Sequence, residues 1–180
     1  MIDYFVALGS NLPSTHGDPA ATLRHAVTIL HYDQDITITA MSRFCHTAAY
    51  PPGAGPDFVN AALIARSALS PAAFLDRLHR VEAAFGRRRE GARWQARPLD
   101  LDLIGAGDLV LPDPATQAHW RDLPPDQQAL AAPEMLILPH PRLQDRDFVL
   151  RPLSEIAPGW RHPLTGLTTV EMLAKLGKHA

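Results

Sequence analysis

Residues 2–9 read Ile-Asp-Tyr-Phe-Val-Ala-Leu-Gly, and this stretch decides how the rest of the chain can fold. The run is mostly apolar, and the glycine at its end favours a tight turn. A short apolar run bounded by a turn residue predicts a strand that is buried inside a sheet. We therefore expect residues 2–8 to form a central strand, beside or upon which the following segments pack.

Outward from this strand, cap and periodicity signals predict two helices and three more strands. Asp18-Pro19 and Ser70-Pro71 each place a capping residue before a proline, which is typical of a helix start. The expected elements are a helix over 19–31, a strand over 35–46, a strand over 58–67, a helix that starts at 71 and stops at Gly86, and a strand over 99–104. This order predicts an α+β fold of the ferredoxin-like type, an antiparallel sheet with helices packed on one face.

The second half of the chain carries weaker signals. Residues 108–134 are rich in Pro, Asp, Gln and Ala, and we interpret them as an insertion with a short helix over 115–122 or 126–131. Residues 135–138 are consistent with another strand. Thr168, followed three residues later by Glu171, has capping-box spacing for a last helix. The length of 180 residues predicts a single domain over 1–180.

Composition excludes several classes of protein. The longest apolar runs are far shorter than the ~20 residues of a membrane span, and we expect no signal peptide. A single cysteine rules out an internal disulfide and suggests a cytoplasmic location. The net charge of -2 argues against a polycation that binds nucleic acid.

An arginine cluster runs directly into two aspartates on a predicted strand. Five arginines lie within residues 87–97, and Asp100 and Asp102 follow. Strand alternation puts both aspartates on one face, where two carboxylates repel each other unless a cation lies between them. Magnesium prefers such carboxylates together with water and phosphate oxygens, and guanidinium groups match phosphate. The combination indicates phosphoryl transfer with a bound metal.

The simpler interpretation is a solvated sheet face whose aspartates pair with arginines, and for an isolated Asp-x-Asp it would be preferred. The adjacent arginine cluster favours the functional interpretation instead. The chain contains neither the G-x-x-x-x-G-K-[ST] of a P-loop nor a G-x-G-x-x-G, so any nucleotide must be held by other groups.

Four motifs in order resemble the 6-hydroxymethyl-7,8-dihydropterin pyrophosphokinase family of folate biosynthesis. They are Leu8-Gly9-Ser10-Asn11-Leu12, Asp57-Phe58-Val59-Asn60-Ala61, Arg93-Trp94-x-x-Arg97-x-x-Asp100-Leu101-Asp102, and Pro139-His140 followed by Arg146-x-Phe148. The resemblance extends from residue 2 to about 158. It implies a ferredoxin-like α+β fold and transfer of pyrophosphate from ATP to the pterin's hydroxymethyl group, which yields AMP, with two Mg²⁺ ions.

The resemblance also implies roles for individual residues. The implied metal ligands are Asp100 and Asp102. The implied nucleotide-binding residues are Glu82, Arg87, Arg89, Trp94, Arg97, His140 and Arg146. The implied pterin-binding residues are Thr47, Phe58, Asn60, Asp100 and Phe148. The implied catalytic residues are Arg87, Arg89, Arg97, Asp100 and Asp102. The expected partners are ATP and 6-hydroxymethyl-7,8-dihydropterin, with no nucleic acid and no membrane, and we expect a monomer.

Alternatives remain open at this point. Phe58 and Phe148 would otherwise be ordinary core residues, and His140 a structural loop histidine. A ferredoxin-like RNA-binding module could use the 87–97 loop for phosphate contacts and Trp94 for base stacking. A degenerate family member with a regulatory role is a third possibility.

Overall fold

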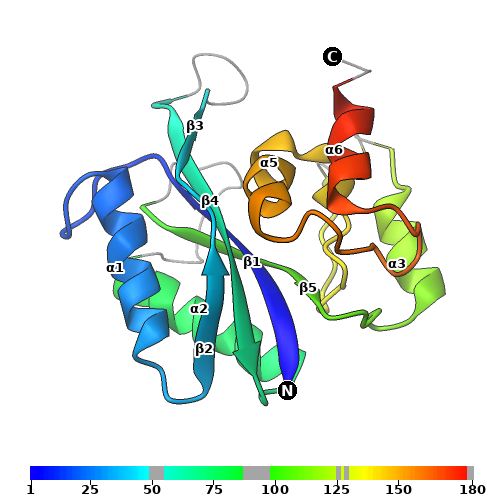
Figure 1. The fold of residues 1–180 in the computed structure, drawn as a ribbon, viewed down its shortest axis with the longest axis horizontal. Helices are drawn as coiled ribbons and strands as arrows, with labels where there is room; N and C mark the ends of the chain where they lie inside the picture. The colour runs from blue at the N-terminus through cyan, green and yellow to red at the C-terminus, as the bar shows by residue number, and fades with distance from the viewer. Residues whose placement is uncertain (49–54, 87–97, 125–126, 128–129, 178–180) are drawn as a thin grey trace.

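One antiparallel sheet, flanked by helices on two sides, organises the computed structural model (Figure 1). The structure describes residues 1–48, 55–86, 98–124, 127 and 130–177. In chain order the elements are β1 (Ile2–Ser10), α1 (Pro19–His31), β2 (Ile36–Met41), β3 (Cys45–Thr47), β4 (Phe58–Ser67), α2 (Pro71–Ala84), β5 (Asp100–Ala106), α3 (Pro114–Arg121), the 3₁₀ turn η1 (Leu143–Asp145), α5 (Asp147–Ile156) and α6 (Thr169–Leu176). The strands lie in the order β2-β4-β1-β5, and β3 pairs with β4 beyond the end of β2.

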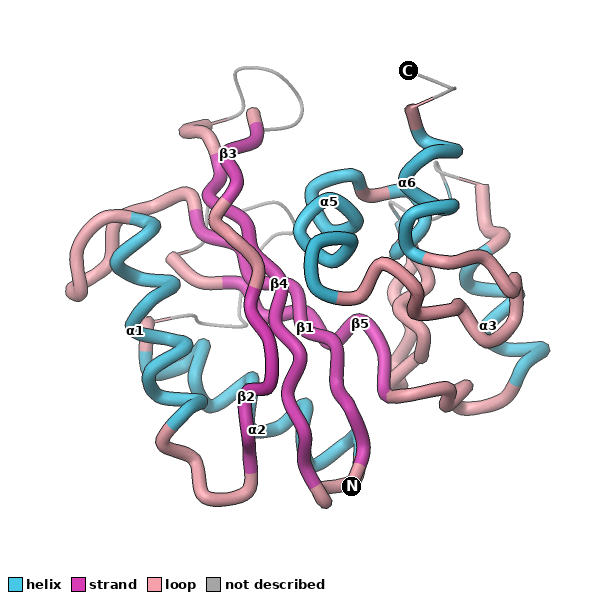
Figure 2. The backbone as a smooth tube through the Cα atoms, in the orientation of Figure 1, coloured by secondary structure: helices cyan, strands magenta, loops and turns pink. Residues whose placement is uncertain are grey.

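β1 is the central strand, as predicted, because its side chains alternate between two apolar cores. Tyr4, Val6 and Leu8 belong to the core formed with α1 and α2. Phe5 and Ala7 belong to a second core formed with α5 and α6. A strand that is apolar on both faces requires a cover on each of them. In Figure 2 the strands accordingly form a layer between two groups of helices.

The first two helices begin and end where their sequence signals predict. The Asp18 carboxylate accepts a hydrogen bond from the Ala21 N–H at 2.7 Å, and the Ser70 hydroxyl accepts one from the Ala73 N–H at 3.3 Å. Each bond satisfies a backbone donor that the first turn leaves unpaired. α2 ends before Gly86, whose φ of 81° few other residues adopt. Both caps and the glycine stop are therefore confirmed.

The expectation that helices cover only one face is wrong, because α5 and α6 cover the opposite one (Figure 1). α5 contributes Val149, Leu150 and Leu153 to the second core. Pro152 lies inside this helix and lacks the N–H that a helix interior normally uses. Burial of the three apolar side chains stabilises the helix despite that missing bond. Because this stabilisation is tertiary and a proline lies in the helix interior, the local sequence does not indicate a helix here.

The single strand expected over 35–46 is two strands, β2 and β3. Between them the Ser42 N–H donates to the Ala62 carbonyl, and the Ala62 N–H donates to the Ser42 side-chain oxygen, each at 2.9 Å. A side chain thus replaces one backbone acceptor of the ladder and interrupts it. The two strands flank this point, and both pair with β4.

Residues 135–138 do not form the expected strand. Leu138 makes one bridge, with Leu111, through hydrogen bonds of 2.9 and 3.1 Å. Pro112 and Pro139 follow the two bridging residues directly and have no N–H to extend the ladder. The pairing therefore stops after one residue pair.

Two other helical predictions are confirmed. α3 covers almost the range expected for a helix at 115–122, and half of the alternative range at 126–131 lies outside the described residues. The capping box of α6 is present, with hydrogen bonds in both directions between Thr168 and Glu171. Within the described part of the chain, no helix has the length and apolar character needed to cross a bilayer.

The loop before α6 is built around a buried histidine. His162 is fully buried, and its Nδ1 accepts hydrogen bonds from the N–H groups of Leu164 and Thr165 at 3.2 and 3.3 Å. Burial lowers the pKa of His162 from 6.5 to about 4, and the positive charge of Arg121 contributes further. His162 is therefore neutral in the folded protein at pH 7.

We predict that His162 weakens the fold in acid. Its folded pKa lies below the unfolded value, so the unfolded chain binds the extra proton and stability is lost as pH falls from about 6.5 towards 4. His162→Asn keeps an acceptor near the Nδ1 position and should flatten the fall in unfolding free energy over this range by up to about 1.4 kcal/mol per pH unit. Denaturant unfolding at several pH values measures this. Exposed His31→Asn is the control, and parallel curves for wild type and His162→Asn would refute the prediction.

Candidate active site

Three neighbouring strands present one row of residues at the end of the sheet. Gly9 of β1 pairs with Asn60 of β4 on one side and with Asp100 of β5 on the other. A Cβ atom at position 9 would lie 3.1 Å from the Asn60 Oδ1 and 3.9 Å from the Phe58 ring. Because glycine has no Cβ, Asn60 and Asp100 flank a strip of backbone without a side chain of its own. Asn60, Phe58 and the space above Gly9 therefore lie on the same face.

The Asn60 amide is held in one orientation. Asn60 is 5% exposed, and its Nδ2 donates a hydrogen bond of 2.7 Å to the Thr47 hydroxyl on β3. This bond leaves one Nδ2 hydrogen and the Oδ1 acceptor for a further partner. The half-buried Phe58 ring lies two residues away on the same face. A flat molecule with donors and acceptors along its edge matches these groups.

Asp100 and Asp102 lie on this same face because β5 alternates. Asp102 pairs with Ala7 of β1, which faces the second core, while Leu101 and Leu103 enter the first core. Both carboxylates are half-buried. The sequence-based expectation that the aspartates share one face and the leucines the other is therefore confirmed.

Glu82 holds the same strand from the other side. This residue of α2 is 1% exposed, and its Oε1 accepts a hydrogen bond of 2.8 Å from the Leu101 N–H. Leu101 lies between the two aspartates, so the bond fixes the backbone that carries them. Glu82 is thus packed beneath β5 and is not among the residues gathered on the aspartate face.

The start of α5 brings a cation and an aromatic ring to the aspartates. Arg146 Nη1 lies 3.2 Å from Asp102 Oδ2, and its guanidinium carbon lies 5.7 Å from the centre of the Phe148 ring. Phe148 is 38% exposed. The cation therefore contacts a carboxylate on one side and an aromatic ring on the other.

His140 is tied to β5 and is uncharged. The backbone N–H of His140 donates to the Ile104 carbonyl at 2.8 Å, and the ring Nδ1 accepts from the backbone N–H of Arg142 at 3.1 Å. Burial lowers the pKa of His140 to about 3, with Arg146 and Arg142 adding to the effect and Asp100 opposing it. Since Nδ1 is an acceptor, the ring proton is assigned to Nε2, which can donate to an anion.

The aspartate pair fits a hard divalent cation. The described residues contain no group of three or more His, Cys, Asp or Glu side chains that could enclose a metal ion. Two carboxylates with water and substrate oxygens are nonetheless a usual magnesium environment. Asp102 already pairs with one cation, the Arg146 guanidinium, at 3.2 Å.

The structure brings most of the sequence-predicted residues to one end of the sheet. Those described on this face are Thr47, Phe58, Asn60, Asp100, Asp102, His140, Arg146 and Phe148. Arg87, Arg89, Trp94 and Arg97 lie outside the described residues. The sequence analysis gave Gly9 no role beyond a turn and a family motif, and it did not single out Arg142, whose backbone N–H donates to His140 Nδ1. The strand register reveals the role of Gly9, whereas nothing local in the sequence distinguishes Arg142.

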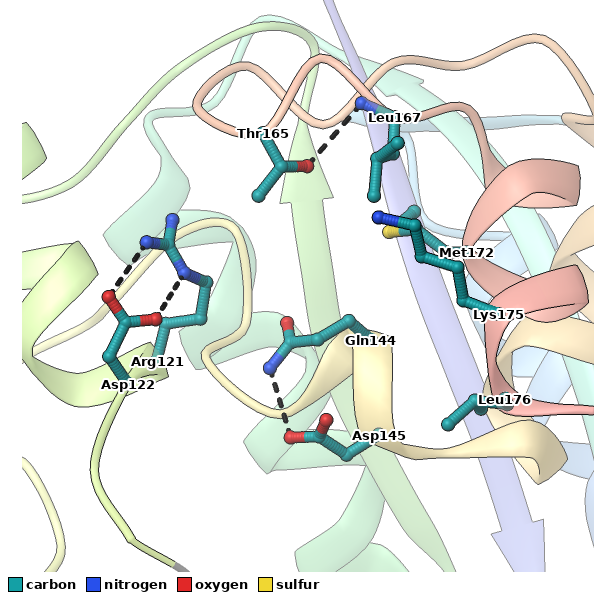
Figure 3. A pocket seen from close by; sticks show the side chains of 9 residues that line it. All are labelled: Arg121, Asp122, Gln144, Asp145, Thr165, Leu167, Met172, Lys175 and Leu176. Carbon is teal, nitrogen blue, oxygen red and sulfur yellow. Dashed lines mark hydrogen bonds and ion pairs between the residues drawn. The ribbon is translucent and has the colours of Figure 1, made fainter. Parts of the chain in front are cut away.

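A separate pocket of about 360 Å³ lies between α3, η1 and α6 (Figure 3). Figure 3 shows the Arg121 guanidinium turned onto Asp122, and the two contacts measure 2.8 and 3.0 Å. Gln144 turns its amide towards Asp145 at 3.0 Å. None of the sequence-predicted site residues lines this pocket, so it is distinct from the candidate active site.

Comparison with known proteins identifies relatives over nearly the whole chain. Residues 5–158 match the family described as 7,8-dihydro-6-hydroxymethylpterin-pyrophosphokinase. The Synechocystis protein named 2-amino-4-hydroxy-6-hydroxymethyldihydropteridine pyrophosphokinase is 34% identical over 171 residues, which cover 95% of this chain and 74% of that protein. The Methylorubrum extorquens protein of the same name is 35% identical over 175 residues, covering 96% of this chain and 92% of the other.

Solved structures share the fold at low sequence identity. A crystal structure described as HPPK-DHPS in complex with substrates has a TM-score of 0.70 at 12% identity over 99% of this chain. Wild-type Plasmodium falciparum HPPK-DHPS has a TM-score of 0.66 at 13% identity over 97%. This chain spans 44% and 41% of those longer chains, respectively. The likeness establishes a mixed fold of helices and antiparallel sheet.

Proposed function

The chain belongs to the 7,8-dihydro-6-hydroxymethylpterin-pyrophosphokinase family, and we infer that it transfers pyrophosphate from ATP to the hydroxymethyl group of 6-hydroxymethyl-7,8-dihydropterin in folate biosynthesis. The observation that supports the location of this activity is the row formed by Asn60, Gly9 and Asp100, with Asp102 in the next row. The RNA-binding alternative finds no support among the relatives.

In this proposal the pterin lies above Gly9. Asn60 supplies a donor and an acceptor to its aminopyrimidinone edge, and the hydrogen bond to Thr47 holds the amide in place. Phe58 and Phe148 provide aromatic faces from β4 and α5, two elements that pack together. Stacking on such faces adds about 0.5–1.5 kcal/mol beyond the burial of area. Orientation of the ring then directs the hydroxymethyl group towards the aspartates.

Asp100 and Asp102 would hold Mg²⁺ in this proposal, and we keep the expected number of two ions as part of it. The metal, when bound, supplies neutralisation of phosphate charge. His140 would donate its Nε2–H to the triphosphate, and Arg146 would contact the same oxygens. Arg87, Arg89, Trp94 and Arg97 remain assigned to the nucleotide. The resemblance assigned Glu82 to the nucleotide as well, and in this proposal we reassign it to the support of the strand that carries the aspartates.

For this reaction the protein mainly has to position the two substrates and to neutralise the charge on the phosphates. The pterin hydroxyl oxygen forms a bond to the β-phosphorus of ATP while the bond from that phosphorus to the bridging oxygen of AMP breaks. The hydroxyl proton is released as the new phosphate ester forms. An acceptor held in line by Asn60 and a nucleotide held by cationic groups meet both requirements.

The remaining expectations belong to this proposal as well. We assign the sheet to the ferredoxin-like arrangement, which the strand order β2-β4-β1-β5 supports, and residues 108–134 to an insertion. We also propose that the protein acts as a monomer in the cytoplasm. Its proposed substrates are two small molecules.

We predict that the two aspartates are required for turnover. Asp100→Asn or Asp102→Asn preserves the size of the side chain but removes the negative charge that holds the metal. Formation of AMP from ATP and 6-hydroxymethyl-7,8-dihydropterin should fall by about 10³-fold, since metal stabilisation of transferred charge is worth several kcal/mol. Exposed Asp108→Asn, on the turn after β5, is the matched control. Near-normal AMP formation by both site variants would refute the assignment.

We also predict that Gly9→Ala weakens pterin binding selectively. The new Cβ would lie 3.1 Å from Asn60 Oδ1 and displace the amide from its place. Loss of one oriented hydrogen bond corresponds to about tenfold weaker binding of the pterin, with the affinity for an ATP analogue nearly unchanged. Gly159→Ala, where an added Cβ meets nothing within 4 Å, is the control for calorimetric titration. Equal losses of both affinities would count against this location.

A further inference from the structure

Arg146 contacts two surfaces that the proposed function assigns to other molecules. Its Nη1 lies 3.2 Å from Asp102 Oδ2, where a metal ion is proposed to bind. Its guanidinium also lies over the Phe148 ring at 5.7 Å, where the pterin is proposed to stack. The Arg146 and Asp102 side chains are 26% and 36% exposed, so solvent screens the pair only in part.

A divalent ion at Asp102 competes with this guanidinium. Both are cations, both use the same carboxylate, and their mutual repulsion prevents them from sharing it closely. A free metal ion must therefore displace Arg146 and leave the guanidinium with water as its only new partner. An ion that arrives with a polyphosphate brings anionic oxygens to which the displaced fork can donate.

No other described cation makes this contact. His140 is neutral because burial and the neighbouring arginines lower its pKa, so it does not replace Arg146 as a counter-charge. Arg142 gives its backbone N–H to the His140 ring and adds positive charge nearby. Arg151 lies one turn along α5 and pairs with Asp147 at 3.1 Å on the exposed side.

We propose that Arg146 makes the Asp100–Asp102 site selective for a divalent ion that arrives with a polyphosphate over the free ion. Arg146 acts as an internal cation that occupies Asp102 until phosphate oxygens accept its guanidinium. The inference rests on the proposed function, because it takes the aspartate pair as the metal site. It adds a specificity role to a residue otherwise assigned only to nucleotide contact.

The test measures Mn²⁺ binding to the full-length protein without nucleotide, from the electron paramagnetic resonance signal of free Mn²⁺. Arg146→Gln removes the internal cation and should bind Mn²⁺ about three- to tenfold more tightly than the wild type. Arg151→Gln makes the same change in net charge on the same helix and should leave the affinity unchanged. Arg146→Lys, which keeps a charge but loses the planar fork, should lie between the other two.

Repeating the titration with a non-hydrolysable ATP analogue separates selectivity from simple affinity. The analogue should tighten Mn²⁺ binding by a larger factor in the wild type than in Arg146→Gln, because only the wild type has a guanidinium on Asp102 that can move to the phosphate oxygens. Equal factors, or equal Mn²⁺ affinities without nucleotide, would overturn the inference. So would an equal gain in Arg151→Gln, which would show a general effect of charge.

Two further measurements make the outcomes distinguishable. Thermal unfolding verifies that each variant is folded. If Arg146→Gln is not folded, the Mn²⁺ affinity of Arg146→Lys is compared with that of the wild type instead. Asp102→Asn should abolish the tight Mn²⁺ binding of an Arg146→Gln background. If Asp102→Asn abolishes Mn²⁺ binding but Arg146→Gln does not change the Mn²⁺ affinity, only the present inference fails. If Asp102→Asn does not change the Mn²⁺ affinity either, the proposed metal site fails together with the inference.

Discussion

The register of β1 between β4 and β5 is the constraint on which the site depends. It aligns Asn60, Gly9 and Asp100 in one row and sets Asp102 one row further in. Side chains in a strand alternate, so a slip of one residue in β5 would turn the aspartates into the first core and its leucines onto the site. Burial of Leu101 and Leu103 makes such a slip unfavourable, and the packing of the first core thereby holds Asp100 and Asp102 on the opposite face of β5.

The second helical layer completes the site from above the same face. α5 is anchored in the second core by Val149, Leu150 and Leu153, so its first turn, with Arg146 before it, is held against β5. Asp102 pairs with Arg146, and the positive charges of Arg146 and Arg142 act together with burial to keep His140 neutral. The site thus carries donors and charges of both signs within a small region.

Much of this arrangement could be predicted from local sequence signals. The caps of α1 and α2, the bounds of β4 and the shared face of the aspartates follow from residue types and spacing alone. The second layer could not be predicted in this way, because Pro152 obscures α5 and its pairing with the sheet is a tertiary effect. The apolar residues on both faces of β1 require a cover on each side of the sheet, but they do not identify the segment that supplies the second one.

The division of 35–46 into two strands shows a different limit. It depends on the Ser42 side chain, which enters the ladder opposite Ala62, and the periodicity of the sequence does not predict this contact.

The predicted metal and nucleotide roles rest on the Asp-x-Asp motif and its neighbours, and they were assigned from the family resemblance. The structure adds the contacts of Arg146 and the slot above Gly9, both of which require residues distant in sequence.

The most direct measurement is a crystal structure of the protein grown with Mn²⁺ and a non-hydrolysable ATP analogue, with anomalous scattering used to locate the metal. The account predicts an anomalous peak at coordinating distance from the carboxylates of Asp100 and Asp102, with Arg146 moved from Asp102 to the phosphates. A bound nucleotide whose metal lies away from both aspartates would contradict it.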